Sequence, residues 1–93
     1  MTAEFRDGRV YDGKQLGYIK DDKIYRGSSQ AGYVKDGKIY EGSRQVGYVK
    51  NGDVYNSSNR NVGKIKNYTI KGIERERDDM IVAVYHLLIK KFL

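Results

Sequence analysis

A repeat of about fifteen residues is the feature of this 93-residue chain that most constrains its fold. Residues 32–43 read GYVKDGKIYEGS, and residues 47–55 read GYVKNGDVY. The same frame reads GYIKDDKIY at 17–25, with a partial copy, FRDGRVY, at 5–11 and a degraded copy, GKIKNYTI, at 63–70. Such units are too short to hold a helix between two strands. The chain must therefore form an antiparallel sheet from local pairings.

Two kinds of turn alternate along the repeat. The first kind begins with Asp or Asn and is flanked by β-branched and aromatic residues: Asp7-Gly8, Asp21-Asp22, Asp36-Gly37 and Asn51-Gly52. An Asx-Gly pair tolerates the positive φ angles of a two-residue hairpin turn. The second kind lies between each repeat tyrosine and the next glycine, with predicted tips at 13–14, 27–29, 42–44 and 57–60. We expect four equivalent hairpins around these tips, with the length variation confined to the loops.

The predicted register places two kinds of pair beside each tip. Each repeat tyrosine faces a small apolar residue, in the pairs Tyr11 with Leu16, Tyr25 with Ala31, Tyr40 with Val46 and Tyr55 with Val62. One step further from the tip an aliphatic residue faces a glycine, in the pairs Val10 with Gly17, Ile24 with Gly32, Ile39 with Gly47 and Val54 with Gly63.

Strand alternation then assigns two faces to the sheet. The predicted core face collects the glycines and the branched aliphatic residues Val10, Ile19, Ile24, Val34, Ile39, Val49, Val54, Ile65 and Ile70. The predicted outer face collects Tyr18, Tyr25, Tyr33, Tyr40, Tyr48 and Tyr55 with Lys20, Lys23, Lys35, Lys38 and Lys50.

The last part of the chain, residues 73–93, is predicted to be a hydrophobic C-terminal helix. Acidic residues precede the apolar run that starts at Met80, and Lys90 and Lys91 follow it, an order that suits the helix dipole. A strand is the rival assignment, because the run is rich in Ile and Val. We therefore expect one mainly β domain over 1–93, with antiparallel hairpin repeats of pseudo-four-fold symmetry in 1–72 and the helix in 73–93.

The predicted helix is apolar on all sides, which suggests assembly. One sheet face covers only one side of a helix, and a chain of this size is marginal alone. We expect a homo-oligomer, most simply a two-fold dimer, through Val82, Tyr85, His86 and Ile89. The alternative is a monomer whose sheet wraps far enough round to bury the helix. The apolar run is too short to span a bilayer, which takes about 20 residues.

These residues carry a family resemblance. The four consecutive hairpins, with Asx turns, repeat tyrosines and glycines and a hydrophobic tail, resemble the four-fold β-flower domain of bacterial proteins over residues 5–93. The resemblance implies hairpins arranged as petals about an approximate four-fold axis. It implies no activity or catalytic residue. The chain departs from the pattern at Asp21-Asp22, where the turn glycine is missing, and at Lys64, where the repeat tyrosine is missing.

Few residues of the chain suggest catalysis, a metal site or a cofactor site. The chain has no cysteine, and its single histidine, His86, lies inside the apolar run, where a core or interface role with one hydrogen bond is the simpler interpretation. The carboxylates of residues 74–79 alternate with Arg75 and Arg77, as in a solvated first helical turn. We predict no enzyme, no cofactor and no metal site. No secretion signal is evident, so we expect a cytoplasmic protein.

The sequence therefore predicts a non-catalytic structural or protein-interaction module that self-associates through its helix. Its candidate interaction surface is Tyr18, Tyr25, Tyr33, Tyr40, Tyr48 and Tyr55 with Lys20, Lys35 and Lys50. The alternative is a basic nucleic-acid-binding module on the same surface, since residues 1–72 hold 14 Lys and Arg against 8 Asp and Glu and carry the whole net charge of +6. Carbohydrate binding by exposed rings is a third possibility, disfavoured by the lack of tryptophan and of an export signal.

Overall fold

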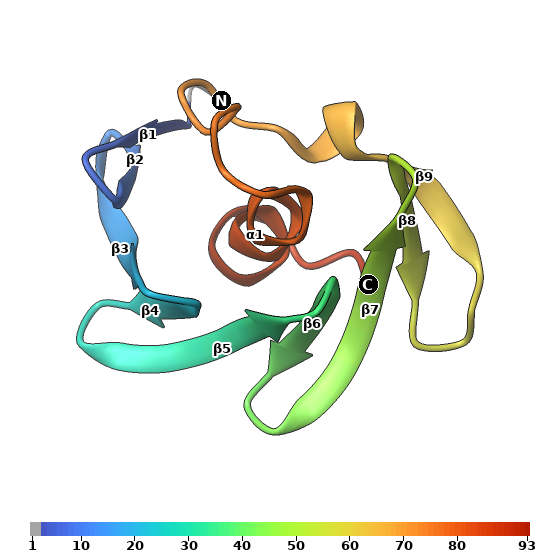
Figure 1. Cartoon of the computed structure of the whole chain (residues 1–93). Coiled ribbons are helices and arrows are strands. Elements are labelled where there is room, and N and C mark those ends of the chain that lie inside the picture. Colours follow the sequence, from blue (N-terminus) through green and yellow to red (C-terminus); the bar gives the residue numbers. More distant parts are fainter. Residues whose placement is uncertain (1–2) are drawn as a thin grey trace.

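The computed structural model describes residues 3–93. One antiparallel sheet curls around a central helix (Figure 1). Nine strands follow one another in sequence order across the sheet. They are β1 (Glu4–Arg6), β2 (Arg9–Asp12), β3 (Lys14–Lys20), β4 (Lys23–Arg26), β5 (Ser29–Lys35), β6 (Lys38–Glu41), β7 (Arg44–Lys50), β8 (Asp53–Asn56) and β9 (Asn61–Lys64). The mainly β hairpin repeat with one C-terminal helix is confirmed.

The Asx turns lie where the sequence places them. The first residue of each has a positive φ: 51° at Asp7, 57° at Asp21, 53° at Asp36 and 53° at Asn51. In three of these turns the next residue is a glycine that also has a positive φ, as a tight hairpin of this type requires. The Asp21-Asp22 turn forms the same connection without the glycine, between β3 and β4.

The register is confirmed for the aliphatic–glycine pairs and wrong for the tyrosine pairs. Val10 faces Gly17, Ile24 faces Gly32, Ile39 faces Gly47 and Val54 faces Gly63. The tyrosines face polar residues instead, in the pairs Tyr11 with Gln15, Tyr25 with Gln30, Tyr40 with Gln45 and Tyr55 with Asn61. The register shifts between the aliphatic residue and the tyrosine in every copy, which marks a β-bulge.

The bulge adds apolar side chains to the core. It leaves one small apolar residue unpaired next to each glycine: Leu16, Ala31, Val46 or Val62. Val46 is buried, and the other three pack against the core. The predicted faces are otherwise confirmed. Six of the predicted core residues are buried and Ile19, Val49 and Ile65 pack against them, whereas the repeat tyrosines are half-exposed.

The symmetry prediction of four petals is wrong, because the degraded last copy also takes a place around the helix. After β9 the chain forms the short 3₁₀ helix η1 (Ile65–Tyr68) in place of a hairpin. It then reaches Lys71, which makes a parallel bridge with Glu4 in β1 and accepts a hydrogen bond of 2.7 Å from the Phe5 N–H. The five copies of the repeat, rather than the four outer loops, therefore define the units around the helix.

Side chains bind two backbone groups of β9, the last strand of the sheet. The Tyr68 hydroxyl donates a hydrogen bond of 2.5 Å to the Val62 carbonyl, and the Asn61 carboxamide oxygen accepts one of 2.9 Å from the Gly63 N–H. An edge strand with free backbone groups invites pairing with another chain. In β9 these two backbone groups already have partners within the molecule.

The C-terminal helix is shorter than the predicted 73–93. It begins as α1 (Asp78–Val84) and continues as a π-helical turn, η2 (Tyr85–Ile89). Residues 73–77 form turns, and Ile73 at their start is buried in the core. Residues 90–93 form an extended tail. The tail leaves the helix axis because Lys90 is in an extended conformation, with a φ of −155°.

The sheet encloses this helix on nearly every side, as Figure 1 shows in a view along its axis. Val82 and Val84 are completely buried, and His86 is 3% exposed, within a single chain. The assumption that a sheet covers only one side of the helix is therefore wrong. A curled sheet provides the cover that the sequence analysis assigned to a second copy.

Gly17, Gly32 and Gly47 have no side chain, which lets the sheet lie this close to the helix and its tail. We predict that a methyl group at Gly32 destabilises the fold. A Cβ there would overlap the Tyr40 carbonyl oxygen and lie 2.8 Å from Cδ1 of Leu87 on the helix. Gly32→Ala should lower the free energy of unfolding by about 1 to 3 kcal/mol, the usual cost of overpacking. Urea denaturation followed by circular dichroism measures this. Ser28→Ala, at an exposed loop tip, is the matched control and should change it by less than about 0.5 kcal/mol. Equal losses in both variants would contradict the close approach.

Candidate functional site

The repeat tyrosines form three ordered pairs on the outer face. Tyr18 stacks on Tyr25 with ring centroids 4.7 Å apart, Tyr33 on Tyr40 at 4.5 Å, and Tyr48 on Tyr55 at 4.9 Å, all within 9° of parallel. The members of each pair lie directly opposite each other on neighbouring strands, where such side chains come into contact. Each ring thus has one face against its partner, each tyrosine is half-exposed, and the Tyr48 hydroxyl donates a hydrogen bond of 3.1 Å to the Asn59 side chain.

Basic side chains flank these pairs, as the sequence predicts. Lys20, Lys35 and Lys50 are exposed, each immediately before an Asx turn. Lys20 faces Lys23 and Lys35 faces Lys38 across the strands, whereas Lys50 faces Asp53. All nine residues of the candidate interaction surface therefore lie on the outer face, but on successive hairpins around the ring.

Hollows separate consecutive hairpins on this outer face. One has a volume of about 480 Å³ and is lined by Asp21, Asp22 and Lys23 of one hairpin and Gln30, Tyr33, Val34 and Lys35 of the next. A second, of about 350 Å³, is lined by Asp7, Gly8, Arg9, Gln15, Tyr18 and Ile19. The residues that line the second hollow occupy the same positions of the repeat as those that line the first. The outer surface thus has two equivalent grooves, each with a tyrosine and a basic residue.

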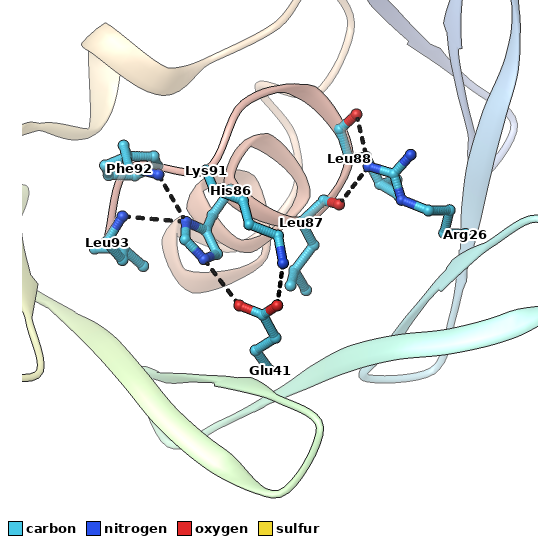
Figure 2. Close-up of polar contacts among 8 residues, drawn as sticks. All are labelled: Arg26, Glu41, His86, Leu87, Leu88, Lys91, Phe92 and Leu93. Carbon is cyan, nitrogen blue, oxygen red and sulfur yellow. Dashed lines mark hydrogen bonds and ion pairs between the residues drawn. The ribbon is translucent and has the colours of Figure 1, made fainter.

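A different repeat position anchors the helix. The residue after each repeat tyrosine varies strongly: Asp12, Arg26, Glu41 and Asn56. Figure 2 shows Arg26 and Glu41 reaching the C-terminal end of the helix from two hairpins. The Arg26 guanidinium donates hydrogen bonds to the carbonyl oxygens of Leu87, at 2.9 Å, and Leu88, at 3.4 Å. These carbonyls are in the last turn, where a cation also complements the helix dipole.

Glu41 joins the helix to its tail. One carboxylate oxygen lies 3.3 Å from Nε2 of His86, and the other accepts a hydrogen bond from the Lys91 ammonium group. On the other side of the ring, Nδ1 of His86 accepts hydrogen bonds from the backbone N–H groups of Phe92, at 3.0 Å, and Leu93, at 3.2 Å (Figure 2). Because Nδ1 accepts, the hydrogen of the neutral ring is on Nε2 and points to Glu41.

These contacts shift the pKa of both titratable groups downward. Burial lowers the pKa of His86 below its usual 6.5, and this effect outweighs the contact with Glu41, which favours the charged ring. The hydrogen bond from Lys91 holds the pKa of the Glu41 carboxyl below its usual 4.5. The histidine therefore acts as a neutral structural link, with more partners than the one hydrogen bond expected from the sequence.

The other end of the helix is tied to the sheet by Asp79. Its side chain is buried, and one oxygen accepts a hydrogen bond of 3.2 Å from the Gly37 N–H in an Asx turn. The Nε of Arg77 lies 3.4 Å from the other oxygen, and the same guanidinium binds Asp22 at 2.6 Å. The acidic turn at residues 74–79 was predicted to be solvated, but its last residue, Asp79, makes an internal contact with the sheet. The repeat pattern does not indicate this contact.

The residues predicted as an oligomer interface separate into two groups. Val82 and His86 are enclosed by the chain itself. Tyr85 and Ile89 are half-buried and line a hollow of about 560 Å³ together with Ala3, Glu4, Thr69, Ile70 and Lys71. Only the second pair remains available at the surface.

Within residues 3–93, no three His, Cys, Asp or Glu side chains lie close enough together to hold a metal ion. In the same part of the chain, no helix has the length and apolar character needed to cross a membrane.

Arg26 gives a test of the helix anchor. Arg26→Met keeps the apolar stem but removes the donors to the last carbonyls, so the free energy of unfolding should fall by about 1 to 2 kcal/mol. Thermal unfolding should show a lower midpoint in proportion. Arg44→Met, at an exposed position that begins β7, is the control and should leave the midpoint nearly unchanged. If the two variants melt alike, Arg26 does not anchor the helix.

A comparison with curated proteins finds no match to the chain, and a comparison with solved structures finds none either. A family model described as "5-fold beta-flower protein" matches residues 4–85, which include every strand and α1. The five copies of the repeat around the helix agree with this description and replace the four-fold arrangement expected from the outer loops. The chain belongs to the 5-fold beta-flower protein family.

Proposed function

We propose that this β-flower protein is a non-catalytic structural or protein-interaction module that makes its contacts through the outer tyrosines and lysines. The observation that carries the proposal is the ordering of six half-exposed tyrosines into three stacked pairs on the outer face, while the helix fills the interior. Tyrosines held in this way lose little side-chain freedom when a partner binds, and the residue is enriched in protein interfaces.

The engagement of the polar groups supports a role without catalysis. The single histidine is buried and hydrogen-bonded to Glu41 and to the backbone of the tail, so it has no free nitrogen to offer a substrate. Asp79 is tied to Gly37 and Arg77. The matched family is not a known family of enzymes.

Self-association through the helix remains part of the proposal in a narrower form. The accessible contact would consist of Tyr85 and Ile89 beside Ala3 and Ile70, a partly apolar hollow at one end of the ring. A two-fold arrangement would bring two such hollows together.

Light scattering after size exclusion tests self-association. We expect the full-length protein to run as a dimer at micromolar concentration, and Ile89→Glu to run as a monomer because it places a charge in the contact. Ser43→Glu adds the same charge at an exposed loop tip and should behave as the unaltered protein. A monomeric unaltered protein would remove self-association and leave the outer surface as the proposed contact.

Nucleic-acid binding is the second candidate, favoured by one observation. Residues 1–72 carry the whole net charge of +6, and exposed lysines flank the tyrosines. Two features count against it: each ring already stacks on another ring, and the pairs lie on separate hairpins rather than on one continuous platform.

Fluorescence anisotropy with a labelled oligothymidine distinguishes the two candidates. At about 50 mM salt the interaction-module proposal predicts no saturable binding, whereas a nucleic-acid module would bind and weaken steeply as the salt rises. Lys35→Gln and Lys50→Gln should each reduce the salt dependence if phosphate contacts exist. Saturable binding that is lost in Tyr33→Ser but not in Ser43→Ala would overturn our preference.

A further inference from the structure

Contacts made by Lys91, Phe92 and Leu93 hold the tail that follows the helix, residues 90–93. Lys91 binds Glu41, and the N–H groups of Phe92 and Leu93 donate to Nδ1 of His86. The ring of Phe92 stacks on Tyr68 with centroids 3.9 Å apart and planes 7° from parallel. The Leu93 side chain fills the space over Gly47, where a Cβ would lie 2.9 Å from Leu93 Cδ2.

Two of these contacts depend on the protonation state of one buried ring. Nδ1 of His86 accepts both backbone hydrogen bonds with its lone pair, and it loses this lone pair when the imidazole is protonated. The resulting N–H would then point at two N–H donors. Nothing similar happens at Nε2, which keeps its hydrogen in both states and keeps Glu41 as its acceptor.

We propose that His86 is an acid-sensitive latch: protonation releases the tail from the molecule while the sheet and helix remain folded. Release withdraws Phe92 from Tyr68 in η1 and Leu93 from Gly47 in β7, and so exposes the apolar surface that these two side chains cover at neutral pH. This inference does not depend on the proposed function.

The surrounding charges make release favourable once the ring is charged. Glu41 on β6 and Lys91 on the tail are the charged groups that act on His86. An imidazolium strengthens the contact of the ring with Glu41 and competes with Lys91 for the same carboxylate, while it repels the Lys91 ammonium group. The contact of His86 with Glu41 on the sheet is thereby strengthened, and its contacts with the tail are weakened.

The direction of the pH dependence follows from the lowered pKa of His86. The folded state binds this proton less readily than the unfolded chain, so the free energy of unfolding should fall as the pH drops below about 6.5. The contribution of Glu41 is complete above about pH 4.5 and is lost only on further acidification, because its pKa is also lowered. Detachment of the tail lets His86 take up its proton without complete unfolding.

Nuclear magnetic resonance of the full chain, from pH 7.5 downward until the His86 ring has titrated, tests the latch. We expect nuclear Overhauser effects between the rings of Phe92 and Tyr68, and between Leu93 and Gly47, to disappear with the same midpoint as the titration of the His86 ring. Those between Tyr33 and Tyr40 in the sheet should persist. If the tail contacts survive after His86 is protonated, or vanish together with the sheet contacts, the proposal is wrong.

His86→Asn is the matched variant, because its carboxamide oxygen takes the place of Nδ1 as an acceptor and does not titrate. We expect its tail contacts to be present throughout the same pH range. Loss of these contacts on acidification in this variant would assign the change to another group and overturn the proposal. If the variant does not fold, coincidence of the two midpoints in the unaltered protein decides the matter.

Discussion

The whole structure depends on how closely the sheet backbone approaches the central helix. At Gly17, Gly32 and Gly47, a Cβ atom would meet Leu88, Leu87 and Leu93 and also a carbonyl oxygen of the neighbouring strand. Without side chains at these points, three consecutive hairpins can lie directly against the C-terminal part of the chain. The β-bulge beside each glycine turns one more apolar side chain toward the core. A small chain thus covers a helix that is apolar on all sides.

Burial alone does not specify how the helix is oriented inside a nearly symmetric ring. The repeats present similar aliphatic side chains from several directions, and hydrophobic burial is not directional. The specifying contacts come from a position where the copies differ. Arg26 binds the last carbonyls of the helix, and Glu41 binds His86 and Lys91. Hydrogen bonds to fixed groups have geometric requirements, so these contacts are satisfied in one rotation and one depth of the helix.

Turns, core faces and the helical nature of the C-terminal run could be predicted because each is a local property. Asx-Gly turns, period-two alternation and the order of acidic and basic residues are properties of short segments. The bulge was missed because Tyr11 to Gly17 can be paired in two registers, and only contacts with the core choose between them. The fifth copy was overlooked as a petal because its hairpin is replaced by η1, although its sequence retains the frame at residues 63–70.

The sequence by itself determined the repeating antiparallel strands, the inner aliphatic and outer tyrosine faces, and the presence of an apolar helix after them. Only the tertiary structure decided that the sheet curls most of the way round this helix, that the segment after β9 closes the gap to β1, and that Val82 and His86 are therefore internal. It also decided that residues as distant as Glu41 and Lys91 meet. The reason is physical: local patterns set the direction in which each side chain points, but the curvature of a sheet is the sum of every bulge and close approach along it.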